Sequence, residues 1–212
     1  MLRNMFRKLV YLFIIIGVCS VQAGSYEDFF SAVRNDNASV VKDLLERGFD
    51  PNTRDGKGQP GLTVAMQEQS LKVTRLLLGQ PSVDVNALNQ AGESALMIAA
   101  LKGNVTSLGL LLERGARINQ PGWSAIHYAA TGPEPQAVRL LLDRGADVNA
   151  ASPNGSTPLM MAAQYGAEAS VNLLLERGAD ARLRNQRDLR AADFARLGGR
   201  ESLTRVLEQA QR

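Results

Sequence analysis

A block of about 33 residues recurs along this 212-residue chain, and the repetition limits its fold more than any other feature. Four clear copies of a leucine-rich closing segment lie at Leu44–Asp50, Leu111–Arg117, Leu141–Asp147 and Leu174–Asp180. The matching block starts carry an apolar residue at Leu62, Leu96, Ile126 and Leu159, at spacings of 34, 30 and 33 residues. A unit this short cannot bury a hydrophobic face alone, so we expect successive units to stack into one elongated array.

Each block has the start and stop signals of two short helices, which are clearest between residues 157 and 178. Thr157 is suited to an N-cap with Pro158 in the first turn, and Gly166 ends that helix. Gly178 follows the second helix as a left-handed C-terminal cap. The apolar faces are Leu159, Ala162 and Ala163 in the first helix, and Val171, Leu174 and Leu175 in the second.

The pattern resembles the ankyrin repeat over roughly residues 26 to 208. Ser156–Ala163 and Gly145–Ala150 match the consensus nearly residue for residue, and Ser124–His127 is a looser copy of the Thr-Pro-Leu-His signature. The resemblance implies an all-α repeat solenoid of helix-turn-helix units with short β-hairpin fingers. It also implies protein binding along the concave face. We place six units at residues 26–52, 53–86, 87–119, 120–149, 150–182 and 183–212, the first and last being caps. The fourth unit is three residues short in its finger.

Residues 1–23 are predicted to be a secretory signal peptide. Arg3, Arg7 and Lys8 precede an apolar run over residues 9–18, and small residues before Gly24 suit a cleavage site. We therefore expect an exported protein that resembles the signal-bearing bacterial ankyrin-repeat proteins, most simply a periplasmic one. Membrane-anchored and secreted forms are the alternatives. An uncleaved anchor, or lipidation of Cys19, would make the membrane a partner.

Charge and composition exclude several classes of function. From Gly24 onward the chain has 21 basic and 21 acidic residues, without the cationic surplus of a nucleic-acid binder. A single histidine, His127, cannot build a multi-histidine metal site, and a single cysteine cannot form an internal disulfide. No motif places a nucleophile or a second base beside His127, so we expect no catalysis and no cofactor. The resemblance implies that His127 holds the hairpin backbone.

The variable repeat positions are the candidate partner-binding residues. In the ankyrin family, the two residues after the Ala-Ala pair and those around the finger face the concave groove. The first group contains Gln67, Glu68, Leu101, Lys102, Thr131, Gln164 and Tyr165, and the finger positions add Glu93, Trp123 and Ser156. Trp123 and Tyr165 are the expected aromatic anchors. Packing of Trp123 into the space left by the short finger is an equally weighted alternative.

The last unit adds a secondary candidate surface. From Ala181 onward there are eight arginines and four acidic residues, and Arg182, Arg184 and Arg187 lie in its finger. These arginines would suit an acidic partner or an anionic membrane surface, and a solvated cap is the alternative. The sequence thus predicts a non-enzymatic, monomeric protein-protein interaction module in the cell envelope. A membrane-tethered or secreted effector that binds a host protein is the alternative function.

Overall fold

The computed structural model describes residues 24–211, and these residues form a stack of helix pairs. Residues 24–34 are helical and pair with α2. The helices that follow are α2 (Ala38–Glu46), α3 (Gly61–Gln67), α4 (Leu71–Leu78), α5 (Ala95–Leu101), α6 (Val105–Glu113), α7 (Ala125–Thr131), α8 (Pro135–Asp143), α9 (Pro158–Tyr165), α10 (Glu168–Glu176), α11 (Ala191–Leu197) and α12 (Glu201–Gln209). The predicted all-α repeat solenoid is confirmed.

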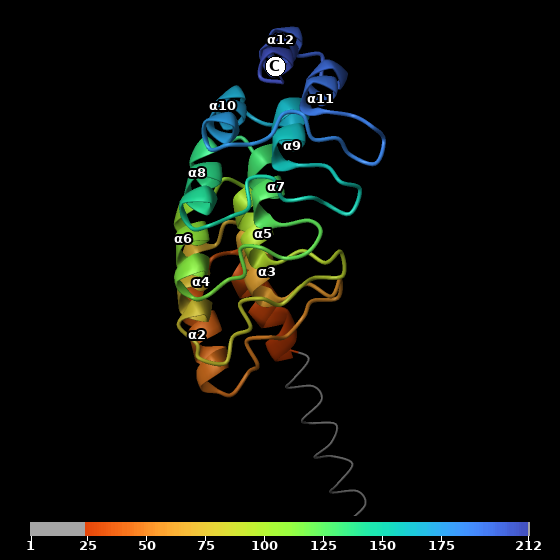
Figure 1. The fold of residues 1–212 in the computed structure, drawn as a ribbon. Coiled ribbons are helices and arrows are strands. Elements are labelled where there is room, and N and C mark those ends of the chain that lie inside the picture. Colours follow the sequence, from red (N-terminus) through yellow and green to blue (C-terminus); the bar gives the residue numbers. More distant parts are fainter. Residues whose placement is uncertain (1–23, 212) are drawn as a thin grey trace, which may run out of the picture.

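The helices form two parallel layers (Figure 1). Helices α3, α5, α7, α9 and α11 stack in one layer, from which the finger loops project. Helices α2, α4, α6, α8 and α10 stack in the other, and α12 packs against α11. The four apolar marker residues of the block starts are all buried in one continuous core. Stacking therefore buries the faces that single units could not bury alone.

The capping signals act where the sequence places them. The Thr157 side chain accepts a hydrogen bond from the backbone N–H of Met160, and Gly166 is the C-cap of α9. Gly145 and Gly178 have φ values of +88° and +87°, in the left-handed region that favours glycine. Local sequence thus sets the length of each helix.

The fingers are less regular than the predicted β-hairpins. Within residues 24–211, pairing is limited to isolated bridges between Arg54 and Pro60 and between Leu88 and Ser94. Side chains accept hydrogen bonds from backbone N–H groups that a longer hairpin would pair with carbonyl oxygens. Asn89 Oδ1, for example, accepts from the N–H groups of Ala91 and Glu93, at 3.0 and 2.9 Å. Such side-chain turns hold the finger tips with almost no strand.

Asparagines at one repeat position join successive units. Asn52, Asn86, Asn119 and Asn149 occupy equivalent positions and each accepts a backbone N–H of the next unit. In one case Asn119 Oδ1 accepts from the N–H of Asp147 at 3.0 Å, and its Nδ2 donates to the Gly145 carbonyl at 2.8 Å. These two-way contacts fix the register of the stack.

Arg200 adds hydrogen bonds between the last unit and the rest of the array. Arg200 Nη1 donates to the carbonyl oxygens of Ala162, Ala163 and Gly166, at 2.9, 3.1 and 2.9 Å. These carbonyls lie at the C-terminal end of α9, where a cation is favoured by the helix dipole. Arg200 therefore closes the stack at the end of the chain that the structure describes.

Candidate partner-binding groove

His127 is a structural residue at the base of the concave face. Its side chain is 1% exposed, and its Nε2 lies 3.0 Å from the Ala150 carbonyl and 3.1 Å from the Ser156 carbonyl. Since carbonyl oxygens only accept, Nε2 carries the proton and Nδ1 accepts from the backbone N–H of Ser124 at 3.3 Å. His127 thus ties the start of α7 to the next finger, as the resemblance implied.

Burial lowers the pKa of His127 below its ordinary value, against the opposing effect of the hydrogen bonds to Ser156 and Ala150. The Ser124 hydroxyl lies 3.1 Å from Nδ1, but Ser124 is only 1% exposed. A substrate has no access to this hydroxyl, and Nε2 is oriented by carbonyls rather than by a carboxylate. The pair therefore lacks the geometry of a nucleophilic site.

Trp123 packs within its own unit and also faces two pockets. Its ring packs edge-on against the His127 ring, with the centroids 5.3 Å apart, and Gln120 Nε2 donates to its carbonyl at 3.0 Å. The short finger is closed by these contacts. The half-buried Trp123 side chain also forms part of the wall of two pockets on the concave face.

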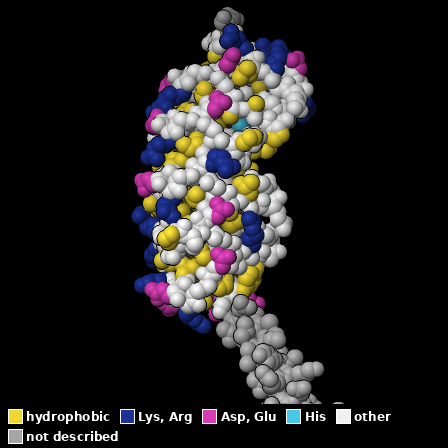
Figure 2. All heavy atoms as spheres, turned by 60° about the horizontal axis from the view of Figure 1, so that its bottom comes forward, with side chains coloured by type: hydrophobic (Ala, Val, Ile, Leu, Met, Phe, Trp, Pro, Cys, Tyr) yellow, Lys and Arg dark blue, Asp and Glu magenta, His cyan; other side chains and the backbone are white. Residues whose placement is uncertain are grey.

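The first pocket has a volume of about 270 Å³ and lies across α5, α7 and α9. It is lined by Leu101, Trp123, His127, Tyr128, Thr131 and Met161. The structure thus brings together three of the predicted binding residues, Leu101, Thr131 and Trp123. In Figure 2 the molecule is hollowed between two projecting groups of atoms, and hydrophobic side chains are exposed beside the hollow.

The second pocket, of about 300 Å³, continues from the first toward α11. Trp123 and Met161 line both pockets, so the two are adjacent, and together we call them the C-terminal groove. The further lining residues are Asn154, Ser156, Gln164, Tyr165, Asn185, Arg187, Leu189, Phe194 and Leu197. Tyr165 is 60% exposed and Leu197 is 63% exposed. Exposed large apolar side chains that gather along a groove are typical of a binding surface.

The remaining candidates lie apart from this groove. Lys102 is exposed just after α5 and does not line either pocket. Gln67 and Glu68 belong to the second unit, at the end of α3, and do not line the groove. The structure therefore concentrates the predicted surface on the C-terminal half of the array.

The groove residues that the sequence analysis missed include Tyr128, Met161, Phe194 and Leu197. The first three occupy the repeat position just before the alanine that opens the small-residue pair, where the unit before them has Ile98. A large apolar residue at this position in successive units was a signal that could have identified the groove wall.

Tyr128 is held in place by a contact between units. Its hydroxyl donates to Glu93 Oε1 at 3.0 Å, and Asn89 Nδ2 donates to Glu93 Oε2 at 2.8 Å. Burial and the Glu93 carboxylate raise the pKa of Tyr128 to about 12. The third finger thus fixes one wall of the groove through the Glu93 carboxylate.

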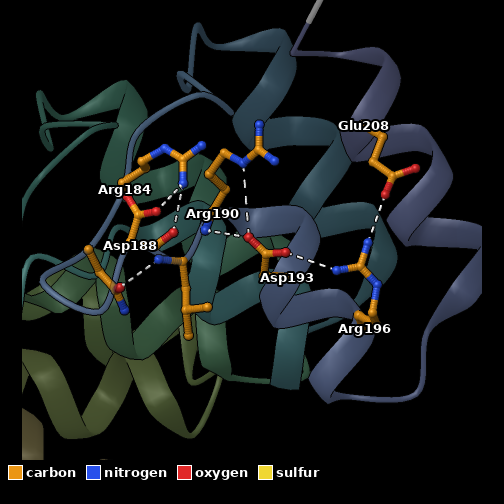
Figure 3. Close-up of polar contacts among 8 residues, drawn as sticks. Arg184, Asp188, Arg190, Asp193, Arg196 and Glu208 are labelled. Atoms are coloured by element: carbon orange, nitrogen blue, oxygen red, sulfur yellow. Dashed lines mark hydrogen bonds and ion pairs between the residues drawn. The ribbon is translucent and has the colours of Figure 1, made fainter.

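The secondary surface of three arginines is largely neutralised by its own unit. Arg184 Nη1 donates to Asp188 Oδ2 at 2.8 Å, beside the linked ion pairs of Arg190, Asp193, Arg196 and Glu208 (Figure 3). Arg182 Nε lies 2.9 Å from Asp180 Oδ1. Within residues 24–211, Arg187 has no carboxylate at ion-pair distance. Of the three, Arg187 alone remains available, and it lines the C-terminal groove.

The described part of the chain holds no group of His, Cys, Asp and Glu side chains suited to a metal ion. None of the helices in residues 24–211 has the length and apolar character that crossing a bilayer requires. The predicted signal segment and Cys19 lie outside the described residues.

Comparison with known proteins identifies relatives of the repeats. The chain is 35% identical over 86 residues to the human transient receptor potential cation channel subfamily A member 1. The aligned segment covers 41% of this chain and 8% of the channel. It is 32% identical over 90 residues to a putative ankyrin repeat-containing protein of Treponema pallidum, which covers 42% of this chain and 30% of that protein. The chain therefore spans less than a third of the length of these curated relatives.

A solved structure shares the fold. It is the complex of a predatory endopeptidase from Bdellovibrio bacteriovorus with an immunity protein, and the matched chain has a TM-score of 0.75 and 24% identity. The match covers 86% of this chain and 97% of that chain. The family described as ankyrin repeats, in three copies, matches residues 29–121 and 110–185. From the repeat pattern, the stacked helix pairs and these matches, we conclude that the chain belongs to the ankyrin-repeat family.

Proposed function

We propose that the chain is an exported ankyrin-repeat module that binds a protein of the cell envelope through the C-terminal groove. Ankyrin repeats are protein-protein interaction modules, and no constellation of catalytic residues is present in the described part of the chain. The observation that carries the proposal is the pair of adjacent pockets, the second of which has Tyr165 and Leu197 largely exposed although both are large and apolar. The balanced charge from Gly24 onward supports a protein partner over a nucleic acid.

Export rests on the signal pattern of residues 1–23. The intact mass of the protein from the periplasmic fraction should lack these residues and begin at Gly24. A full-length mass in the membrane fraction would favour the tethered form, and recovery from the medium would favour the secreted effector.

The binding surface is tested by capture from envelope extract with matched variants. Tyr165→Asp combined with Leu197→Asp places charges in the groove at exposed positions, so folding should be retained. Asn172→Asp is the control, at an exposed position of α10 in the opposite layer.

We expect the wild type and the control to capture the same protein and the groove variant to lose it. Because one similar solved structure holds an endopeptidase with an immunity protein, an envelope enzyme is one partner that this capture would identify. Equal capture by all three forms would refute the groove as the binding surface.

A further inference from the structure

The histidine, tyrosine and threonine of the first pocket offer no free hydrogen-bond donor. Both ring nitrogens of His127 are engaged, the Tyr128 hydroxyl donates to Glu93, and Thr131 Oγ1 donates to the His127 carbonyl at 2.9 Å. Leu101 and Met161 complete the lining together with the Trp123 ring. A carbonyl or carboxylate occupant would lose hydrogen bonds to water without replacement, so this mostly apolar lining favours an apolar occupant.

The size of this pocket favours a side chain over a separate small molecule. At about 270 Å³ it lies just below the roughly 300–1,000 Å³ that is typical of ligand and cofactor sites. Trp123 of the short fourth finger forms part of the wall, and the pocket is open to a projecting side chain of another protein. We therefore take its occupant to be one large apolar side chain of a bound segment.

The second pocket differs from the first because a charged side chain lies at its rim. Arg187 contributes a guanidinium without an ion-pair partner in the described part of the chain, whereas Arg182 and Arg184 are paired within their own loop. Neither pocket is lined by an aspartate or a glutamate. Arg187 therefore adds a positive charge without a carboxylate partner at the second pocket, and this charge favours a carboxylate of the bound segment.

The two pockets share Trp123 and Met161, so one segment of chain can fill both. An extended chain advances about 3.3–3.6 Å per residue, and the two contacts would come from residues a few positions apart. We propose that the C-terminal groove binds an acidic segment of a partner protein, in which a large apolar side chain enters the first pocket and a nearby carboxylate pairs with Arg187. The inference rests on the proposed function and specifies the chemistry of its partner.

The experiment selects a phage-displayed library of random 12-residue peptides on the chain as purified from cells. The same selection is run on Arg187→Glu and on Arg205→Glu. Arg205 is an exposed arginine of α12 outside the groove, also without an ion pair among the described residues, so its reversal is the matched control. All proteins are first compared by circular dichroism and melting temperature.

We expect the wild type and Arg205→Glu to enrich peptides with an aromatic or large aliphatic residue and an Asp or Glu within a few positions. Arg187→Glu should keep the apolar preference and lose or invert the acidic one. A wild-type-selected peptide should bind Arg187→Glu about tenfold more weakly in fluorescence anisotropy, and Arg205→Glu within about twofold.

The outcomes separate the inference from the proposed function. Peptides that lose binding to Tyr165→Ala but show no acidic preference would overturn the inference and leave the groove as the binding surface. Peptides that bind Tyr165→Ala and Leu197→Ala normally would overturn both. Failure to enrich any peptide would overturn the inference, while capture of a folded partner still decides the proposed function independently.

Discussion

The buried histidine makes the stability of the fold depend on pH in a calculable way. Burial lowers the pKa of His127 in the folded chain, whereas the unfolded chain has the ordinary value of about 6.5. Below that pH the unfolded state takes up a proton that the folded state does not, so the stability contributed by neutral His127 is present above about pH 6.5 and lost as the pH falls. Acidification should therefore destabilise the array well before its carboxylates titrate.

The magnitude follows from proton linkage. While the folded histidine stays neutral, the free energy of unfolding falls with a limiting slope of about 1.4 kcal/mol per pH unit. Between pH 7.0 and 5.5 this gives a loss of up to about 1.3 kcal/mol from this one residue. A loss of that size is measurable because His127 is the single histidine of the chain.

The neighbouring units supply the matched variant, His127→Met. Met97 and Met160 occupy the equivalent position, and each sulfur accepts the backbone N–H of its own N-cap residue at 3.4 Å. The substitution removes the titrating group and keeps this kind of contact. It also leaves the Ala150 and Ser156 carbonyls without the Nε2–H donor, so we expect it to cost about 1–3 kcal/mol at pH 7.

The assay is urea unfolding at several pH values between 7.0 and 5.5, followed by far-ultraviolet circular dichroism and by tryptophan fluorescence. Trp123 is the only tryptophan of the chain and packs on His127, so its emission reports the fourth unit directly. The wild type should lose stability over this range and His127→Met should stay nearly constant. Parallel losses in both proteins would refute the assignment of a neutral, buried His127.

Four further substitutions test how the repeat is built, each measured by thermal unfolding. Gly145→Val should cost about 1–2 kcal/mol from backbone strain alone, because φ is +88° and no neighbour lies within 4 Å of an added Cβ; an unchanged melting temperature would contradict the capping role. Gly166→Ala should cost more, about 2–4 kcal/mol, because its Cβ would collide with the Ala130 carbonyl oxygen, whereas Gly109→Ala in open space within α6 should stabilise by about 0.5–1 kcal/mol. Asn119→Ala should cost about 1–3 kcal/mol, since it removes both hydrogen bonds to the fourth unit, and a loss below 0.5 kcal/mol would show that these bonds do not hold the register.

The fold could be predicted because its signals are local and repeated. Thr157, Gly145 and Gly166 cap their helices for reasons that lie within a few residues of each position. The stacking also followed from the sequence, since no unit could bury its apolar face alone. The fingers were predicted less well, because side-chain turns such as that of Asn89 replace most of the hairpin pairing.

The groove was predicted only in part because it depends on how neighbouring units face each other. Tyr128 lines a pocket through its bond to Glu93, which is 35 residues away in the sequence. Arg182 and Arg184 form ion pairs with neighbouring aspartates, and a count of arginines does not reveal this pairing. Exposure likewise distinguishes Tyr165 from Trp123, because only Tyr165 is largely free of packing.

Site-specific photocrosslinking in living cells tests the central claim most directly. A photoreactive amino acid is placed at Tyr165 or Leu197 in the groove, and at Asn172 or Arg205 outside it; all four positions are exposed. The account predicts that both groove positions crosslink to the same envelope protein and that the two outer positions give no such adduct. Adducts formed from Asn172 or Arg205, with none from the groove, would contradict it.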